Sequence, residues 1–346
     1  MSLPFVIKAG ASARQRLLEQ DFAPELFSAM LGASGGPKWF VLSGLDQFLG
    51  GEFLAGRSLD LLGSSVGGWR MAAHASADPV AAIVRFRDFY HHLSYAQGAT
   101  PRHISDSSRA MVTTLLGSRG AEEIVANPLK QLHLVTAGCK GLLQSERKGP
   151  QMLGLGLAAL GNVLHRRSLG AFFSRSIFHT GSQPHWFGTG DLPTEYLPLT
   201  QRNLPKALEA TGAIPLVLEG VALDGSRHKV HRDGGIIDYH FDLPFHTQGL
   251  VLYPHFYPQA IPGWFDKGLK WRKPKAAHYD NVVMVAPSPA LVAELPYGKI
   301  SDRKDFEQLD DDSRIRYWQE VIDAGNRLAD SFAASLKNGQ WRQALL

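Results

Sequence analysis

The sequence predicts an α/β protein with a mostly parallel central sheet and helices on both faces, in three layers. Three observations indicate this class: short apolar runs typical of buried strands, longer runs with helical apolar spacing, and an alternation of the two early in the chain. The chain has 346 residues, 44% hydrophobic and 20% charged. This composition is ordinary for a globular protein, and the chain is long enough to form a substantial core.

The first elements alternate most clearly. We expect buried strands over residues 25–31 and 58–62, each followed by a helix, over 40–49 and 66–75 respectively. Parallel strands need such crossover helices, so the order predicts a parallel pair. Functional residues of this architecture gather where the strands end.

The rest of the chain continues this pattern less regularly. Further elements are expected at 81–93, 105–116, 127–136, 249–255, 281–286 and, as one or two long helices, 305–336. No internal repeat or low-complexity linker divides the chain. We therefore expect a single domain over 1–346, with a mid-chain cap or insertion around 97–195 and a helical C-terminal region over 305–346.

The pentapeptide Gly63-Ser64-Ser65-Val66-Gly67 lies between the expected strand at 58–62 and the helix that follows. A sharp strand-to-helix turn needs small neighbours, which Gly63 and Gly67 provide on either side of Ser65. The turn would lift the Ser65 hydroxyl to a helix N-terminus. The pattern is typical of a nucleophilic serine, although an ordinary structural turn remains the alternative for the pentapeptide alone.

A glycine-rich loop, residues 32–39, occupies the earlier strand-to-helix junction. Pro37 has no N–H, so Gly35 and Gly36 are the expected amide donors for an anion, with the positive charge of Lys38 beside them. The loop does not match a phosphate-binding P-loop, which needs Ser or Thr after the lysine, or the G-x-G-x-x-G dinucleotide fingerprint.

Asp233-Gly234-Gly235 follows a probable strand at 228–231 far downstream. Alone, this tripeptide is most often a turn. In company with the glycine loop and the serine elbow, in that order, it resembles the patatin-like phospholipase family. A small-residue helix leading into Ala213-Ile214-Pro215 adds to the resemblance, which spans residues 25–245.

The resemblance implies a lipid acyl hydrolase of the phospholipase A or esterase type. Ser65 would be the nucleophile, Asp233 its base, and Gly35 and Gly36 the oxyanion hole. Lys38 would support the anion. The loop departs from the family's usual Asp-Gly-Gly-Gly opening and Arg-Gly close, which leaves the contacts of Lys38 open.

Two other functions stay open. A Ser-His-Asp hydrolase would use Asp233 with His240 or His246, because these histidines follow the acid in the chain order of that class. A non-catalytic lipid-binding or regulatory protein would retain the fold without the chemistry. Asp-Gly-Gly after a strand favours the Ser-Asp dyad over the triad.

We expect no cofactor and no metal. His228 and His231 are three apart on an expected strand and therefore face opposite sides, which does not suit a shared ion. The single cysteine, Cys139, cannot form an internal disulfide and is expected to be a buried core residue.

The remaining expectations concern membranes. Residues 152–164 are the most apolar stretch but are too short to cross a bilayer, so we expect a buried helix, with an apolar flap over an acyl pocket as the alternative. The N-terminus lacks the pattern of a secretory signal. We expect a cytoplasmic protein without a nucleic-acid partner that contacts anionic membranes peripherally. The basic residues of its Trp-containing segment would make that contact: Lys267, Lys270, Arg272, Lys273 and Lys275.

Overall fold

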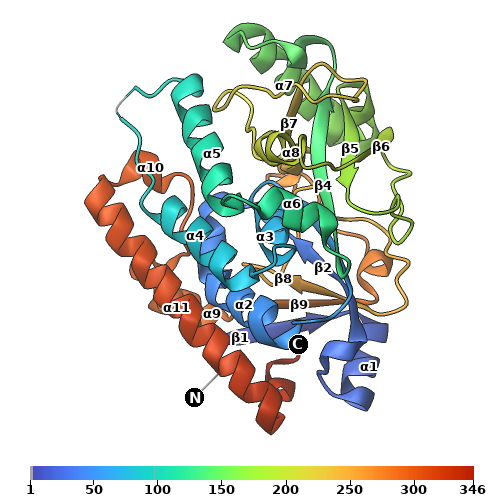
Figure 1. Cartoon of the computed structure of the whole chain (residues 1–346), viewed down its shortest axis with the longest axis vertical. Helices are drawn as coiled ribbons and strands as arrows, with labels where there is room; N and C mark the ends of the chain where they lie inside the picture. The colour runs from blue at the N-terminus through green and yellow to red at the C-terminus, as the bar shows by residue number, and fades with distance from the viewer. Residues whose placement is uncertain (1–2, 97) are drawn as a thin grey trace.

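A nine-stranded sheet organises the protein. The computed structural model describes residues 3–96 and 98–346; positions 1, 2 and 97, where two of the expected domain ranges begin, lie outside these residues. The strand order is β1-β9-β8-β2-β3-β4-β5-β6, with β7 paired to β4. Figure 1 shows the sheet running through the middle of the molecule, and α11 lies along the lower left side of the molecule.

The sheet is mixed but mostly parallel. Neighbours from β9 through β8, β2 and β3 to β4 are parallel, as are β5 and β6, whereas β1 on β9 and both β5 and β7 on β4 are antiparallel. The predicted α/β class with a mostly parallel sheet is therefore confirmed. The strands are β1 (Phe5–Ala9), β2 (Phe27–Gly32), β3 (Leu59–Ser64), β4 (Lys130–Cys139), β5 (Phe173–His179), β6 (Thr194–Pro198), β7 (His231–Asp233), β8 (Leu250–Pro254) and β9 (Val282–Pro287).

Helices pack against this sheet and against one another. α3 contacts β2, β3 and β4, α8 contacts β4, and α2 lies between α4 and the long α11. The helices are α1 (Ala11–Gln20), α2 (Ser43–Phe48), α3 (Val66–His74), α4 (Pro79–His91), α5 (Pro101–Leu116), α6 (Gly120–Ala126), α7 (Lys148–Leu164), α8 (Leu204–Thr211), α9 (Pro289–Glu294), α10 (Asp305–Gln308) and α11 (Asp311–Asn338).

Several helix ends follow directly from local sequence. The side chains of Asp78, Thr100 and Asp310 accept hydrogen bonds from backbone N–H groups in the first turns of α4, α5 and α11. Such caps satisfy donors that a helix leaves unpaired. Gly339 ends α11 in the left-handed conformation, with φ of 75°, which costs glycine little.

The largest departures from the expected elements occur where tertiary contacts override local pattern. The strand expected at 25–31 begins only at Phe27, because Pro24–Leu26 form a 3₁₀ turn. The helix expected at 40–49 is a 3₁₀ segment, Gly36–Leu42, followed by α2. Between the expected elements at 127–136 and 249–255, the stretch 141–183 contains α7 and β5.

Residues 152–164 form a helix as expected, but the prediction that this helix is buried is wrong. These residues form most of α7, and its large apolar side chains lie on the surface except for that of Leu155, which is buried. Figure 1 shows α7 at the upper end of the molecule, away from the core of the sheet.

The segment expected as a cap or insertion, around 97–195, includes strands β4 and β5 and the start of β6 of the central sheet. Its described part therefore contributes to the sheet itself as well as carrying α5, α6 and α7. The C-terminal range 305–346 holds α10, α11 and a 3₁₀ turn at Gln340–Ala344. Among the described helices, none combines the length and apolar character needed to cross a bilayer.

Candidate active site

Ser65 occupies a strained turn between β3 and α3. Its backbone has φ of 55° and ψ of −135°, a conformation that non-glycine residues rarely adopt and that is concentrated at functional sites. Glycine is required at position 67, because a Cβ there would lie 1.9 Å from the carbonyl oxygen of Gly32. The turn thus has the small neighbours expected at Gly63 and Gly67 and presents Ser65 beyond the end of the strand.

The Ser65 hydroxyl meets the Asp233 carboxylate. Ser65 Oγ donates to Asp233 Oδ2 at 2.8 Å, and the other carboxylate oxygen accepts from Gly235 N–H at 2.7 Å. Asp233 ends β7, which pairs with β4 beside β3, and its own N–H donates to Ala213 O. Two residues 168 positions apart in the chain are therefore held in direct contact in the described structure.

Burial shapes the acid–base properties of this pair. It raises the pKa of the Asp233 carboxyl to about 6, against the opposing effect of the hydrogen bonds from Ser65 and Gly235. The carboxylate is ionised at neutral pH yet holds a proton more readily than an exposed aspartate. That is the range in which a side chain can take and return a proton.

The glycine loop faces the same space. Gly36 has φ of 57°, a left-handed conformation that favours glycine. Within the described residues, the backbone N–H groups of Gly35 and Gly36 make no hydrogen bond to protein. Both glycines line the cavity that contains Ser65 and Asp233, so two amide donors are free to bind an anion there.

Hydrogen bonds hold the three segments together. Ser34 Oγ lies 2.7 Å from Ser64 Oγ, and Ser64 Oγ donates to the Asp238 carbonyl at 2.6 Å. On the other side, Thr211 Oγ1 accepts from Ser65 N–H at 2.9 Å and donates to Val135 O at 2.6 Å. The glycine loop, the elbow and the Asp233 turn are therefore fixed relative to one another by buried polar groups.

These residues surround a cavity of about 270 Å³. Sequence reasoning found Ser65, Asp233, Gly35, Gly36 and Lys38 among its lining residues. It missed the walls, which come from segments without a recognisable motif: Tyr239, Trp264, Lys267, Asp302, Arg303 and Lys304. Only Trp264 and Lys267 belonged to a segment that the sequence singled out, and then for membrane contact.

Cationic side chains line the mouth of the cavity. Lys38 Nζ donates to Asp302 at 2.8 Å, so its charge is already paired. Lys267 Nζ lies 4.0 Å from the ring centroid of Tyr239. Desolvation of that ammonium, together with repulsion from Lys38 and Arg303, lowers the pKa of Lys267 to about 8. The lining of the Ser65 cavity therefore contains more cationic than acidic side chains.

The basic segment expected to contact membranes is divided by the structure. Lys267 lines the cavity, and Arg272 is tied to the protein by hydrogen bonds to Asn162 Oδ1 and Val163 O. Lys270, Lys273 and Lys275 are exposed and do not line this cavity, whereas Lys267 lines it and is exposed as well.

The histidines of the alternative triad lie elsewhere. His240 is fully buried, its Nδ1 accepts from Ile261 N–H at 2.9 Å, and burial holds its pKa well below the usual range. Neither His240 nor His246 lines the Ser65 cavity. The hydroxyl of Ser65 hydrogen-bonds the Asp233 carboxylate directly.

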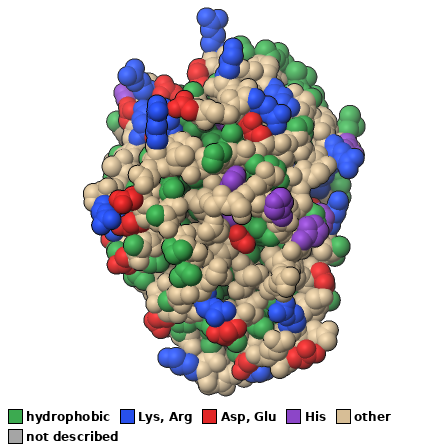
Figure 2. Space-filling view, turned by 45° about the vertical axis from the view of Figure 1, so that its right-hand side comes forward, with side chains coloured by type: hydrophobic (Ala, Val, Ile, Leu, Met, Phe, Trp, Pro, Cys, Tyr) green, Lys and Arg blue, Asp and Glu red, His purple; other side chains and the backbone are tan. Residues whose placement is uncertain are grey.

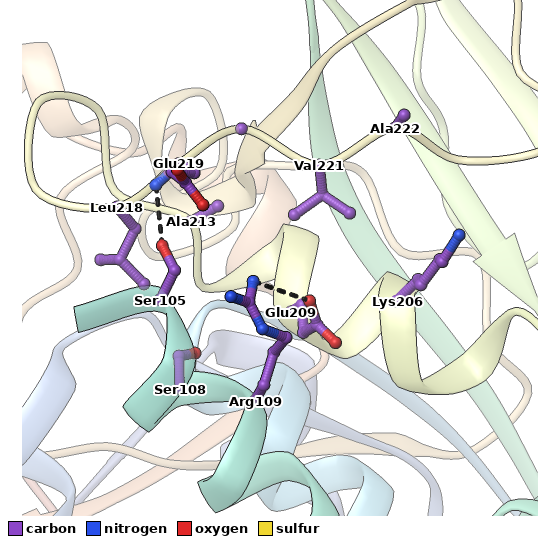
Figure 3. Close-up of a pocket in the computed structure, with 11 residues that line it drawn as sticks. Ser105, Ser108, Arg109, Lys206, Glu209, Ala213, Leu218, Glu219, Val221 and Ala222 are labelled. Carbon is purple, nitrogen blue, oxygen red and sulfur yellow. Dashed lines mark hydrogen bonds and ion pairs between the residues drawn. The ribbon is translucent and has the colours of Figure 1, made fainter. Parts of the chain in front are cut away.

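A second cavity, of about 340 Å³, lies between α5, α8 and residues 213–222 (Figure 3). Ser105 Oγ accepts from Glu219 N–H at 2.9 Å and donates to Pro101 O at 2.8 Å. Arg109 lies 4.0 Å from Glu209. Within the described residues, neither Ser105 nor Ser108 hydrogen-bonds a carboxylate, so this cavity lacks a paired nucleophile and base.

In the described ranges, 3–96 and 98–346, no group of three or more His, Cys, Asp or Glu side chains is arranged to hold a metal ion. The fold and the site together define an α/β protein with a strained serine elbow, a buried carboxylate on the serine hydroxyl, and free amides beside them.

Comparison with known proteins adds little detail. No protein-family model and no curated protein matches the chain. Among solved structures, the chain is similar to "Human GIVD cytosolic phospholipase A2", with 12% sequence identity and a TM-score of 0.38. The match covers 96% of this chain and 62% of that one, so the chain spans less than two thirds of its neighbour.

Proposed function

We propose that the protein is a lipid acyl hydrolase that cleaves carboxylic esters through Ser65 and Asp233, as the resemblance to patatin-like phospholipases implies. One observation carries the proposal: the 2.8 Å hydrogen bond from a strained, cavity-facing serine to a buried carboxylate. A serine hydroxyl needs a base to become a nucleophile, and Asp233 is the group in hydrogen-bond contact with it.

In the first half of the reaction, Asp233 accepts the hydroxyl proton as Ser65 Oγ attacks the ester carbonyl carbon. The negative charge that develops on the carbonyl oxygen is stabilised by the N–H groups of Gly35 and Gly36. The tetrahedral intermediate then collapses, the bond to the leaving alcohol breaks, and Asp233 returns its proton to the alcohol oxygen. Ser65 is left as an acyl ester.

In the second half, Asp233 takes a proton from a water molecule, and the resulting nucleophile attacks the acyl carbon. The proton passes to Ser65 Oγ as the fatty acid leaves. The same carboxyl thus gains and loses a proton twice in each cycle, which suits its pKa of about 6.

The cavity walls favour a lipid ester. Apolar side chains of Ile214, Pro215, Ile236 and Trp264 lie beside Ser65 and suit an acyl chain. Lys267 and Arg303, on the same cavity, suit the phosphate of an anionic headgroup. We therefore propose phospholipids as the preferred substrate class, with the protein working in peripheral contact with anionic membranes.

A fluorophosphonate probe tests the chemistry without knowledge of the lipid. The purified chain should be labelled on Ser65, and the Ser65→Ala variant should not be. Fatty acid and lysolipid release from a panel of phospholipids then identifies the ester. Absence of labelling in a folded wild-type protein would contradict the hydrolase proposal and favour a non-catalytic lipid-binding protein.

A further inference from the structure

α7 turns an apolar face toward the surface of the protein, whereas a helix that packs on the core turns its apolar face inward. Six of its large apolar side chains are between 44% and 86% exposed: Met152, Leu153, Leu157, Leu160, Val163 and Leu164. At 100° per residue they fall within an arc of about 140°. Residues 149–164 contain no charged side chain, so this outer face of α7 is uniformly apolar.

The inner face of α7 buries two polar side chains together with Gly154, Leu155 and Ala158. Gln151 and Asn162 are buried. Gln151 Oε1 accepts from Leu216 N–H at 2.5 Å, and Asn162 Nδ2 donates to Asp266 Oδ1 at 2.6 Å. These contacts fix the rotation of the helix about its axis, so its apolar face is directed outward.

Basic residues border this face. Residues 141–170 and 267–275 together contain nine Lys and Arg and one acidic residue, Glu146. The two segments are joined where Arg272 hydrogen-bonds Asn162 and Val163, and the neighbouring Trp271 is 69% exposed. Figure 2 shows hydrophobic and basic side chains side by side at the upper end of the molecule, where Figure 1 places α7.

We propose that the outer face of α7, with Trp271 and the exposed lysines 270, 273 and 275, docks the protein on an anionic lipid bilayer. An apolar helix face bordered by Lys and Arg is the pattern of helices that lie in the interface between headgroups and acyl chains, where tryptophan is also enriched. Charge argues against a second copy of the chain as occupant, because pairing two such faces would bring like charges together. The choice of a lipid surface rests on the proposed function.

The inner face of α7 connects this surface to the Ser65 cavity. Gln151 holds Leu216, next to cavity-lining Pro215, and Asn162 holds Asp266, next to cavity-lining Lys267. A bilayer on the outer face would therefore lie one helix away from two loops of the cavity, so docking would bring the cavity close to its substrate.

Vesicle co-sedimentation tests the docking surface apart from catalysis. The full chain carrying Ser65→Ala, which leaves the lipid intact, is mixed with phosphatidylcholine vesicles with and without phosphatidylglycerol. We expect preferential binding to the anionic vesicles. Leu160→Asp combined with Leu164→Asp should lower partitioning at least about tenfold, because two charges replace the two most exposed apolar side chains of α7. Lys270→Glu combined with Lys273→Glu should lower partitioning onto the anionic vesicles by roughly tenfold, and the loss should be larger at low salt because the charges are screened less.

Matched controls lie on the other side of the molecule. Leu18→Asp on α1 replaces another exposed leucine, and Arg316→Glu with Lys337→Glu on α11 makes the same change in charge; both should retain vesicle binding. Equal loss in test and control variants, or unchanged binding in the α7 variants, would overturn the proposal. So would wild-type dimers that the leucine substitutions dissociate while vesicle binding persists.

The two proposals fail separately. Fluorophosphonate labelling of Ser65 in lipid-free solution reports on the hydrolase chemistry alone. The same α7 substitutions, made in the chain that retains Ser65, should keep that labelling and lose activity only on vesicles. Labelling without vesicle binding would overturn the docking surface, whereas vesicle binding without labelling would overturn the hydrolase.

Discussion

Two cavities of the described structure both use residues of the segment 213–222 as lining, and they differ in chemistry more than in size. The cavity around Ser105 is the larger, about 340 Å³ against about 270 Å³ around Ser65. Both cavities contain serines and an acidic side chain with a raised pKa. Burial raises the pKa of Glu209 in the Ser105 cavity and that of Asp233 in the Ser65 cavity. Only in the second does the serine hydroxyl contact the carboxylate.

The difference lies in what each hydroxyl is bonded to. Ser105 donates to a carbonyl of its own helix and accepts from Glu219 N–H, so its lone pairs and proton serve structure. Ser65 is lifted from β3 by a strained turn and donates to Asp233. Backbone strain and pairing with a carboxylate, and not cavity volume, are therefore the features that support the proposed role of Ser65.

Replacing each serine in turn is the strongest test of the difference between the two cavities. Ser65→Ala should reduce ester hydrolysis by at least about 10⁴-fold, because the nucleophile is lost. Ser105→Ala should leave kcat within about twofold, since its hydroxyl supports only local backbone groups. Steady-state hydrolysis of a soluble ester measures both. A loss of activity in Ser105→Ala comparable to that of Ser65→Ala would reverse the assignment of the two cavities.

The two acids provide the next contrast. Asp233→Asn should lower kcat by roughly 10²- to 10⁴-fold, because the amide cannot accept the serine proton, while Glu209→Gln should be nearly silent. In the wild type the rate should fall about tenfold per pH unit below about pH 6 as Asp233 becomes protonated. His240→Ala is the additional control: if its effect on kcat matched that of Asp233→Asn, a triad would be indicated.

Asp233 should also make stability depend on pH. Its pKa is about 6 in the folded protein and 3.8 for an ordinary aspartate, so between these values the folded state holds a proton that the unfolded chain has released. Stability should therefore fall by about 3 kcal/mol as the pH rises through this window. Asp233→Asn should be more stable than wild type at pH 7.5 and similar at pH 4, as measured by denaturant unfolding. Ser65→Ala, which retains the charge and removes a donor, should show no such gain.

The smallest expected effect concerns the wall between the cavities. Thr211 ends α8 and supports the Ser65 N–H. Thr211→Val removes both of its hydrogen bonds at nearly constant volume, so we expect a loss of about 1–3 kcal/mol in stability and slower labelling of Ser65. Thr211→Ser keeps the hydroxyl and should retain most of both. Equal labelling rates for the two variants would show that the elbow does not need this support.

Sequence reasoning was strongest where a function-specific pattern coincided with a local structural requirement. Gly63-Ser64-Ser65-Val66-Gly67 is found at the predicted strand-to-helix turn, because only small residues fit where Gly67 approaches Gly32. Asp233 follows a strand as expected, although β7 is only three residues long.

Sequence reasoning was weakest where the role of a residue depends on distant partners. Lys38 was expected to support an anion but is paired with Asp302, 264 positions away. Residues 152–164 were expected to be buried because they are apolar, yet Gln151 and Asn162 turn the helix the other way. Periodicity shows that a helix has two faces, but it does not show which face meets the protein.

The sequence alone determined the α/β class and the local shapes of the glycine loop and the serine elbow, because strand and helix patterns and glycine requirements act over a few neighbouring residues. Only the tertiary structure decided that Ser65 Oγ lies 2.8 Å from Asp233, that no cavity-lining histidine replaces it in the Ser65 site, and that α7 turns its leucines outward. Those features depend on the pairing of β7 with β4 and on buried hydrogen bonds between remote segments, which no local pattern specifies.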